Sequence, residues 1–249
     1  MSTETNRITV GGLTVEVVRK DIKNLHLGVY PPRGWVRVAA PLAVSDDAVR
    51  LAVIGKLGWI KRRQAQFAAQ PRQSRREMVS GESHYFLGRR YRLRVHEHDG
   101  PAIVALHGAT YIDLYVRPGT TREQRELVLR RWYRARLKAL IPPLVEQWQR
   151  ILDVQVAAWG VKRMKTKWGS CNVAARRIWF NLELAKKPER RLEYIVAHEL
   201  AHLRERRHDE RFIALLDHHM PRWRELRDEL NRAPLGHENW SKGPLEGSE

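Results

Sequence analysis

Cysteine is almost absent from this chain of 249 residues, which contains a single one, Cys171. One cysteine cannot form an intramolecular disulfide, and its scarcity agrees with a reducing compartment. Apolar runs are also short, and none approaches the roughly 18 residues that a membrane-spanning helix needs. The first six residues lack the charged-then-apolar pattern of a secretory signal. We therefore predict a cytoplasmic protein with no membrane partner.

Acidic side chains are scarce beside basic ones. The chain has 28 Asp and Glu against 46 Lys and Arg, a formal net charge of +18. This surplus favours polyanionic partners such as nucleic acid or nucleotides, although a solvated arginine-rich surface is the alternative. The charge indicates a class of partner and no more. Clusters of basic residues occur at Lys61-Arg62-Arg63, Arg75-Arg76, Arg89-Arg90 and Arg130-Arg131.

The first third of the chain has the patterns of a β-rich region with one helix. Residues 7–19 predict a hairpin or two short strands around Gly11-Gly12. Residues 25–29 and 35–41 predict two further strands joined by a turn at 31–34. Ser45 begins a helix that we expect to reach about Ala69. A polar stretch at 70–77 follows as a linker, so residues 1–77 form the first predicted domain.

Residues 78–232 predict a second α+β domain. Strands at 83–87, 91–95, 103–106 and 111–116 indicate a small antiparallel sheet, without a repeat array. A capping box at 121–124 opens a long helix with a buried stripe that includes Leu127 and Leu137, and Pro142-Pro143 must bend or interrupt it. Strands at 154–162 and 178–182 and helices at 189–204, 210–216 and 221–230 complete the domain. The tail 233–249 is expected to be flexible.

The most informative stretch is the pattern His-Glu-x-x-His at 198–202. On an α-helix, His198 and His202 lie on one face a single turn apart, so both imidazoles can bind one zinc ion. The carboxylate of Glu199 is rotated by roughly 100° and can reach a metal-bound water as a general base. The neighbouring residues are apolar, which predicts a buried helix. Burying histidine and glutamate without a partner costs free energy, and a metal ion accounts for the pattern.

A catalytic zinc takes three protein ligands and a water molecule. His208 is the first choice for the third ligand. Five residues separate it from His202, so the helix must end and the chain must turn back before His208. The alternatives on later helices are Asp217, His218, His219, Glu225 and Glu229.

Three further features extend the metal pattern: Trp-Gly-Ser-Cys at 168–171, a strand at 178–182 that contains Asn181, and Leu-Gly-Arg at 87–89. Together with His-Glu-Leu-x-His and a third histidine after five residues, they resemble the YgjP-like family of zinc metallopeptidase domains. The resemblance covers most of the chain and is strongest from 160 to 223. Arg207 and Asp209 depart from the Asn and Ser that are frequent in the family. These two changes affect the turn before His208 and leave the ligands unchanged.

The resemblance implies a gluzincin-like core, in which a small sheet packs on the active-site helix. It implies a zinc cofactor and a peptide or protein substrate whose backbone pairs with an edge strand at 178–182. Trp168, Gly169 and Asn181 are expected at the substrate, with Gly169 in a tight turn, although a structural hydrogen bond is the alternative for Asn181. Cys171 is either a group beside the metal or a small buried side chain.

The expected reaction is metal-assisted hydrolysis of a peptide bond. Zinc held by His198, His202 and His208 lowers the pKa of its water toward about 7, and Glu199 passes the proton to the leaving amine. Arg163, Lys165 and Lys167 are the candidates for stabilising the oxyanion.

Two alternatives remain: a metal-dependent nucleoside triphosphate pyrophosphatase, and a nucleic-acid-associated protein with a regulatory metal domain. The sequence contains no P-loop that would support nucleotide binding. A purely structural zinc needs a fourth protein ligand and leaves Glu199 without a role. The oligomeric state is unknown.

Overall fold

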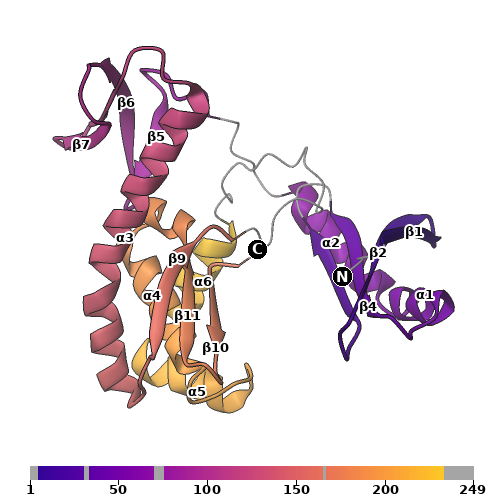
Figure 1. Cartoon of the computed structure of the whole chain (residues 1–249). Helices are drawn as coiled ribbons and strands as arrows, with labels where there is room; N and C mark the ends of the chain where they lie inside the picture. Colours follow the sequence, from indigo (N-terminus) through magenta and orange to yellow (C-terminus); the bar gives the residue numbers. More distant parts are fainter. Residues whose placement is uncertain (1–4, 31–33, 70–75, 165–166, 233–249) are drawn as a thin grey trace. The chain divides into compact units, whose positions relative to one another are not determined.

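The computed structural model describes residues 5–30, 34–69, 76–164 and 167–232, which form two compact units (Figure 1). Described residues up to Ala69 belong to the first unit, and those from Arg76 onward belong to the second. The mixture of helices and small sheets confirms the predicted α+β class. The domain boundary after residue 77 stays a prediction. Most of the expected turn at 31–34, most of the linker and the tail 233–249 lie outside the described residues.

The first unit is a four-stranded sheet with helices on one face. Its strands are β1 (Thr5–Val10), β2 (Leu13–Lys20), β3 (His26–Tyr30) and β4 (Trp35–Pro41), in the order β1-β2-β4-β3. The expected hairpin joins β1 and β2 through Gly11 and Gly12, which both have positive φ. Alternate residues of β2 and β4 are fully buried and form the core with the helices, as Val17 and Val38 do.

The helical segment of this unit is divided in two, which corrects the prediction of one helix. Helix α1 (Asp46–Ile54) begins at Ser45, whose side chain accepts a hydrogen bond from the Ala48 N–H. Helix α2 (Leu57–Ala69) follows after two residues. The division falls at Gly55, which caps α1 and has a low helix propensity. Periodicity did not reveal it, because Val49 and Ile60 are both buried on the same core.

The second unit begins with another four-stranded sheet. Its strands are β5 (Ser83–Phe86), β6 (Arg89–Glu97), β7 (Ile103–His107) and β8 (Tyr111–Val116), in the order β5-β6-β8-β7. Strands β6 and β8 are parallel, so the sheet is mixed and the prediction of an antiparallel sheet was wrong. The chain passes from β6 to the far edge at β7 before β8 returns between them, and sequence patterns do not record such pairings.

The two four-stranded sheets repeat one topology, although the sequence shows no repeat array. A shift of 76 residues carries Gly12 to Gly88, Val36 to Ile112 and the helix cap Ser45 to Thr121. In both sheets the second and fourth strands are parallel and the outer pairs are antiparallel. The copies keep the alternation of buried positions and share few identical residues, which is why self-comparison of the sequence does not reveal them.

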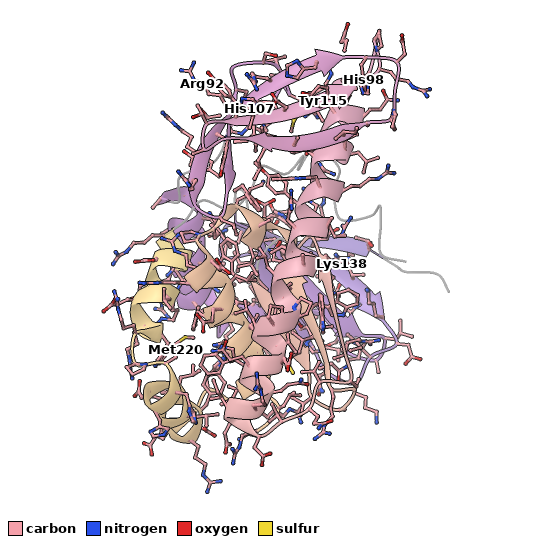
Figure 2. The ribbon with its side chains drawn as sticks, turned by 90° about the vertical axis from the view of Figure 1, so that its left-hand side faces the viewer. Arg92, His98, His107, Tyr115, Lys138 and Met220 are labelled. Atoms are coloured by element: carbon pink, nitrogen blue, oxygen red, sulfur yellow. The ribbon has the colours of Figure 1, made fainter. Side chains whose placement is uncertain are left out.

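Helix α3 (Arg122–Leu152) runs from this sheet along the rest of the second unit, as Figures 1 and 2 show. The capping box at Thr121 forms as predicted. Leu127, expected in the buried stripe, is 43% exposed. Pro142-Pro143 do not interrupt the helix, which was one of the two outcomes expected. Both prolines lie on the exposed side, as do Lys138 and Ala139, so water can solvate the two carbonyls that lose their donors. The buried residues of α3 are Leu129, Tyr133, Leu137, Ile141, Val145, Trp148 and Leu152.

A three-stranded sheet and four short helical segments complete the second unit. Its strands are β9 (Ala158–Lys162), β10 (Gly169–Asn172) and β11 (Arg177–Asn181), and its helical segments are η1 (Leu182–Lys186), α4 (Glu189–Ala201), α5 (Glu210–His219) and α6 (Trp223–Arg232). The strand expected from residue 154 begins only at Ala158. Helix α4 packs against α3 and against β10 and β11, within one hydrophobic core. No described helix has both the length and the apolar character needed to cross a bilayer.

The strand order β10-β11-β9 places β11 in the centre of this sheet. We expected the segment 178–182 at an edge, and that prediction was wrong. The side chains of Ile178 and Phe180 are fully buried on α4, which is the position of a central strand. Strand β10 is an edge strand instead, and it lies beside α4.

Candidate metal centre

Helix α4 positions the first two histidines. It begins after Pro188 and buries eight of its residues, which fixes its rotation in the core. His198 and His202 therefore project from one side, with ring centroids 5.0 Å apart. The helix ends at Ala201, and His202 is its cap, with helical backbone angles.

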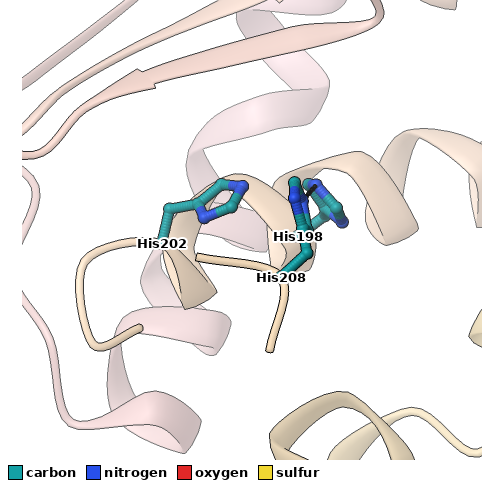
Figure 3. Close-up of side chains that lie close together, drawn as sticks. All are labelled: His198, His202 and His208. Carbon is teal, nitrogen blue, oxygen red and sulfur yellow. Dashed lines mark hydrogen bonds between the residues drawn. The ribbon is translucent and has the colours of Figure 1, made fainter. Parts of the chain in front are cut away.

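The turn after α4 returns the third histidine to this pair. Asp209 caps α5 by accepting a hydrogen bond from the Phe212 N–H, and His208 precedes it. The Nε2 atoms of His208 and His198 are 3.1 Å apart, and one nitrogen from each of the three imidazoles lies within 4.8 Å of the others (Figure 3). Two nitrogens that bind one tetrahedral zinc are about 3.3 Å apart. The donor set and its spacing therefore fit a metal ion, while His218 and His219 contact each other instead.

The pKa values of His198 and His202 are lowered, which favours their neutral imidazole forms. Burial, together with smaller effects of His202 and His208, lowers the pKa of His198 to about 3. Burial also lowers the pKa of His202. The Nδ1–H of His202 donates to the Glu205 carbonyl at 3.2 Å, and the Nδ1 of His198 lies 3.5 Å from the Tyr194 hydroxyl. These contacts leave both Nε2 lone pairs free to bind a metal.

The carboxylate of Glu199 is buried beside this cluster. Glu199 is only 6% exposed. Burial raises the pKa of its carboxyl group to about 7, while Lys167 acts to lower that pKa. A carboxylate with such a pKa can both accept and return a proton near neutral pH. The position therefore suits a general base that later acts as an acid.

The close approach of the Glu199 carboxylate explains why residue 169 is a glycine. A Cβ atom at Gly169 would lie 2.4 Å from Oε1 and 2.6 Å from Cγ of Glu199. The residue lies in strand β10 and does not have positive φ, so the expected tight turn is absent and the close approach of Glu199 excludes a side chain. Gly169 consequently determines where the Glu199 carboxylate lies.

A cleft of about 1050 Å³ opens over the histidines. Residues 167–174, which include β10, form one wall, and α4 forms the floor. Arg206 and three residues of α6, among them Arg227, complete the lining. Three cationic side chains, including Lys167, line the cleft, and Glu199 is the one carboxylate among its lining residues. Arg206 and Arg227 were missed because nothing in their local sequence distinguishes them from solvated surface charges.

Some of the other predicted site residues line the cleft and some do not. Trp168 and Cys171 line the cleft. Burial, with a smaller effect of Glu199, raises the pKa of Cys171 to about 11, so it stays a thiol at neutral pH. Among the oxyanion candidates, Lys167 lines the cleft, Arg163 does not belong to the lining residues, and Lys165 lies outside the described residues.

Asn181 is not exposed to substrate, which corrects its assignment. The residue is fully buried, and its amide donates to the carbonyls of Met164 and Lys167 at 2.8 and 2.7 Å. Its oxygen accepts a hydrogen bond from the Glu183 N–H. Asn181 thus joins the end of β11 to the segment that leads into β10. This is the structural alternative considered above.

Comparison with family models matches residues 23–233 to the YgjP-like, metallopeptidase domain. The chain belongs to the YgjP-like family. The match includes the three histidines and Glu199, and it makes this YgjP-like protein a metal-dependent hydrolase. Among solved structures, the metallopeptidase zymogen abylysin from Pyrococcus abyssi is 24% identical, with a TM-score of 0.34. That alignment covers 35% of this chain and 89% of abylysin. A comparison with curated proteins gives no match.

Proposed function

We propose that this YgjP-like protein is a cytoplasmic, zinc-dependent peptidase whose metal is held by His198, His202 and His208. The observation that carries the proposal is the buried carboxylate of Glu199 beside three converging imidazoles at the floor of an open cleft. Three imidazole nitrogen donors within 4.8 Å of one another, two of them 3.1 Å apart, favour zinc over oxygen-seeking ions such as Mg²⁺ or Ca²⁺.

In the proposed reaction, Glu199 transfers the proton and the residues behind the histidines orient the metal ligands. Zinc, when bound, supplies Lewis acidity and a water of lowered pKa. Glu199 accepts the proton of the attacking water and delivers it to the amine that leaves. The Glu205 carbonyl and the Tyr194 hydroxyl orient the imidazoles from behind. The burial of Glu199 raises its pKa to about 7, so the carboxyl group can hold the proton between its uptake from water and its delivery to the amine.

Strand β10 is the candidate for binding the substrate backbone. It pairs with β11 along one edge, and residues 167–174 line the cleft. An extended peptide that pairs with the other edge would place its carbonyl groups along the cleft. We therefore propose that residues 169–172, and not residues 178–182 as the sequence suggested, pair with the substrate backbone.

The test compares metal content and peptide hydrolysis in the wild type and three variants. We expect near-stoichiometric zinc in the wild type and Glu199→Gln, and much less in His202→Ala, because that variant loses a ligand. Both variants should lose at least about 100-fold in kcat/KM on a fluorogenic peptide library, Glu199→Gln because general-base catalysis contributes roughly 10²–10⁴-fold and His202→Ala because it loses the metal. His218→Ala is the matched control and should keep metal and activity. Unchanged zinc in His202→Ala, or full activity in Glu199→Gln, contradicts the proposal.

A nucleoside triphosphate pyrophosphatase is the second candidate. The observation that favours it is the cationic lining of the cleft by Lys167, Arg206 and Arg227, which suits an anionic substrate. Release of pyrophosphate from nucleoside triphosphates, lost in Glu199→Gln and unaccompanied by peptide cleavage, would establish this alternative.

A further inference from the structure

The outer face of the sheet β5–β8 carries basic and aromatic side chains that the proposed peptidase chemistry does not use. Along β6, Tyr91 and Leu93 point into the core, while the alternating residues Arg90 and Arg92 are exposed. The parallel neighbour β8 places Tyr111 opposite Arg92 and Tyr115 opposite His96. Figure 2 shows Arg92, His107 and Tyr115 along this sheet.

The aromatic rings on this face are held in stacked arrangements. The guanidinium of Arg94 lies 4.2 Å from the centroid of the Tyr111 ring. His96 stacks on Tyr115, with centroids 4.7 Å apart and planes inclined by 19°. Asp113 lies between the two tyrosines and is 3% exposed. It accepts two hydrogen bonds from Arg94, at 2.6 and 2.7 Å, and lies 2.9 Å from Nε2 of His96.

The charge that remains on the face is positive. Asp113 is neutralised by Arg94, which holds the pKa of its carboxyl down at about 2. Within the described part of the chain, Arg90 and Arg92 form no ion pair with an acidic group. The face therefore combines flat aromatic surfaces with exposed cations, and its one buried carboxylate serves to fix the planar groups.

The first sheet shows that the fold does not require these side chains. The shift of 76 residues places Glu16 where the second sheet has Arg92, and Ala39 where it has Tyr115. Glu16 lies 3.9 Å from Arg37, so the equivalent face of the first sheet carries an internal ion pair. The shift also places Trp35 at the position of Tyr111, so both copies have an aromatic ring there, whereas the exposed arginine at 92 and the tyrosine at 115 are found in the second copy alone.

We propose that the outer face of β5–β8 binds single-stranded nucleic acid, with bases stacked on Tyr111 and Tyr115 and phosphates contacting Arg90 and Arg92. The two tyrosines are four positions apart on one strand, so they lie about 13 Å apart along β8. Aromatic side chains stack on unpaired bases of any sequence, and arginines neutralise the backbone. A duplex keeps its base faces inside its own stack, so the rings favour a single strand. The net charge of +18 supports attraction of such a polyanion.

The test measures fluorescence anisotropy of a fluorescein-labelled oligothymidine of about 20 nucleotides with the full chain, between 50 and 200 mM salt. Tyr115→Leu should weaken binding by about fivefold or more, because one stacked base contributes at least about that factor. It should leave the salt dependence unchanged. Arg92→Ala should weaken binding and lower the slope of log K against log salt by about 0.7.

The matched control is Arg131→Ala, which removes the same charge from the exposed side of α3 and should change affinity by less than about twofold. Glu199→Gln should bind like the wild type, which separates this face from the proposed peptidase site. Equal weakening by Arg92→Ala and Arg131→Ala would overturn the proposal in favour of diffuse charge. Absence of binding at 50 mM salt, or a duplex bound as tightly and unaffected by Tyr115→Leu, would overturn it as well. Melting curves confirm that each variant is folded.

Discussion

Replacement of Gly169 by alanine tests whether the position of Glu199 controls the reaction. The added Cβ would lie 2.4, 2.6 and 2.7 Å from Oε1, Cγ and Cδ of Glu199. Non-bonded carbon atoms settle at about 3.5–4.0 Å, so the carboxylate must retreat by about 1 Å. Because Cγ is also too close, rotation of the terminal carboxylate alone does not relieve the overlap.

The retreat has a calculable effect on rate. A displacement of 1 Å in a catalytic group lowers the rate by about 100-fold, or about 2.7 kcal/mol in activation free energy. Metal content should not change, because the three atoms nearest to the new methyl group all belong to Glu199, which is not a proposed metal ligand. The overpacked interface should lower the free energy of unfolding by about 1–3 kcal/mol.

The assay is kcat/KM on a cleaved peptide with metal content measured on the same sample. Gly58→Ala is the matched control, since its Cβ would meet its nearest neighbour, Arg62, at an ordinary 3.7 Å. In a Glu199→Gln background, Gly169→Ala should cause no further loss, because both changes act through one side chain. A kcat/KM within about threefold of the wild type, or an additional loss in that background, would refute the reasoning.

Three further predictions concern stability and metal dependence. Asn181→Ala removes the hydrogen-bond donors for the Met164 and Lys167 carbonyls. Calorimetry should show a free energy of unfolding lower by about 2–4 kcal/mol, although no substrate contact is removed. Lost activity at unchanged stability would contradict this prediction. Asp113→Asn should destabilise the protein by about 1–2 kcal/mol at pH 7 in urea titrations. That difference should disappear as the pH falls from about 4 to 2, because Arg94 lowers the pKa of Asp113 to about 2 and the stabilisation exists only while the carboxylate is ionised. Chelation should abolish peptide hydrolysis and lower the melting temperature, and added zinc should restore both; hydrolysis by metal-free protein would exclude the proposed role of the metal.

The features that sequence predicted are those determined by neighbouring residues. The helix that carries His198 and His202 follows from apolar periodicity, and the capping residues Ser45 and Thr121 start their helices as expected. The return of His208 to the pair also followed from local spacing, since five residues after His202 permit a turn and no continued helix face.

The features that sequence did not predict depend on contacts between distant segments. Strand β11 is central because β9 and β10 both pair with it, and no pattern within residues 177–181 records that order. The reason for Gly169 is a carboxylate 30 positions further along the chain. Pro142-Pro143 stays within a helix because that side of α3 faces water, which depends on how the helix packs.

Two sheets of one topology in a single chain create a hazard during folding. A strand from one copy could satisfy the backbone hydrogen bonds of the other, and strand exchange between tandem units is a known route to misfolding. The inward side chains oppose it. Position 15 holds a fully buried valine, whereas its counterpart at 91 is a tyrosine, so an exchanged β6 would overpack the first core and β2 would leave a void in the second. The divergence of Val15 and Tyr91 thus keeps each strand in its own sheet while the chain folds.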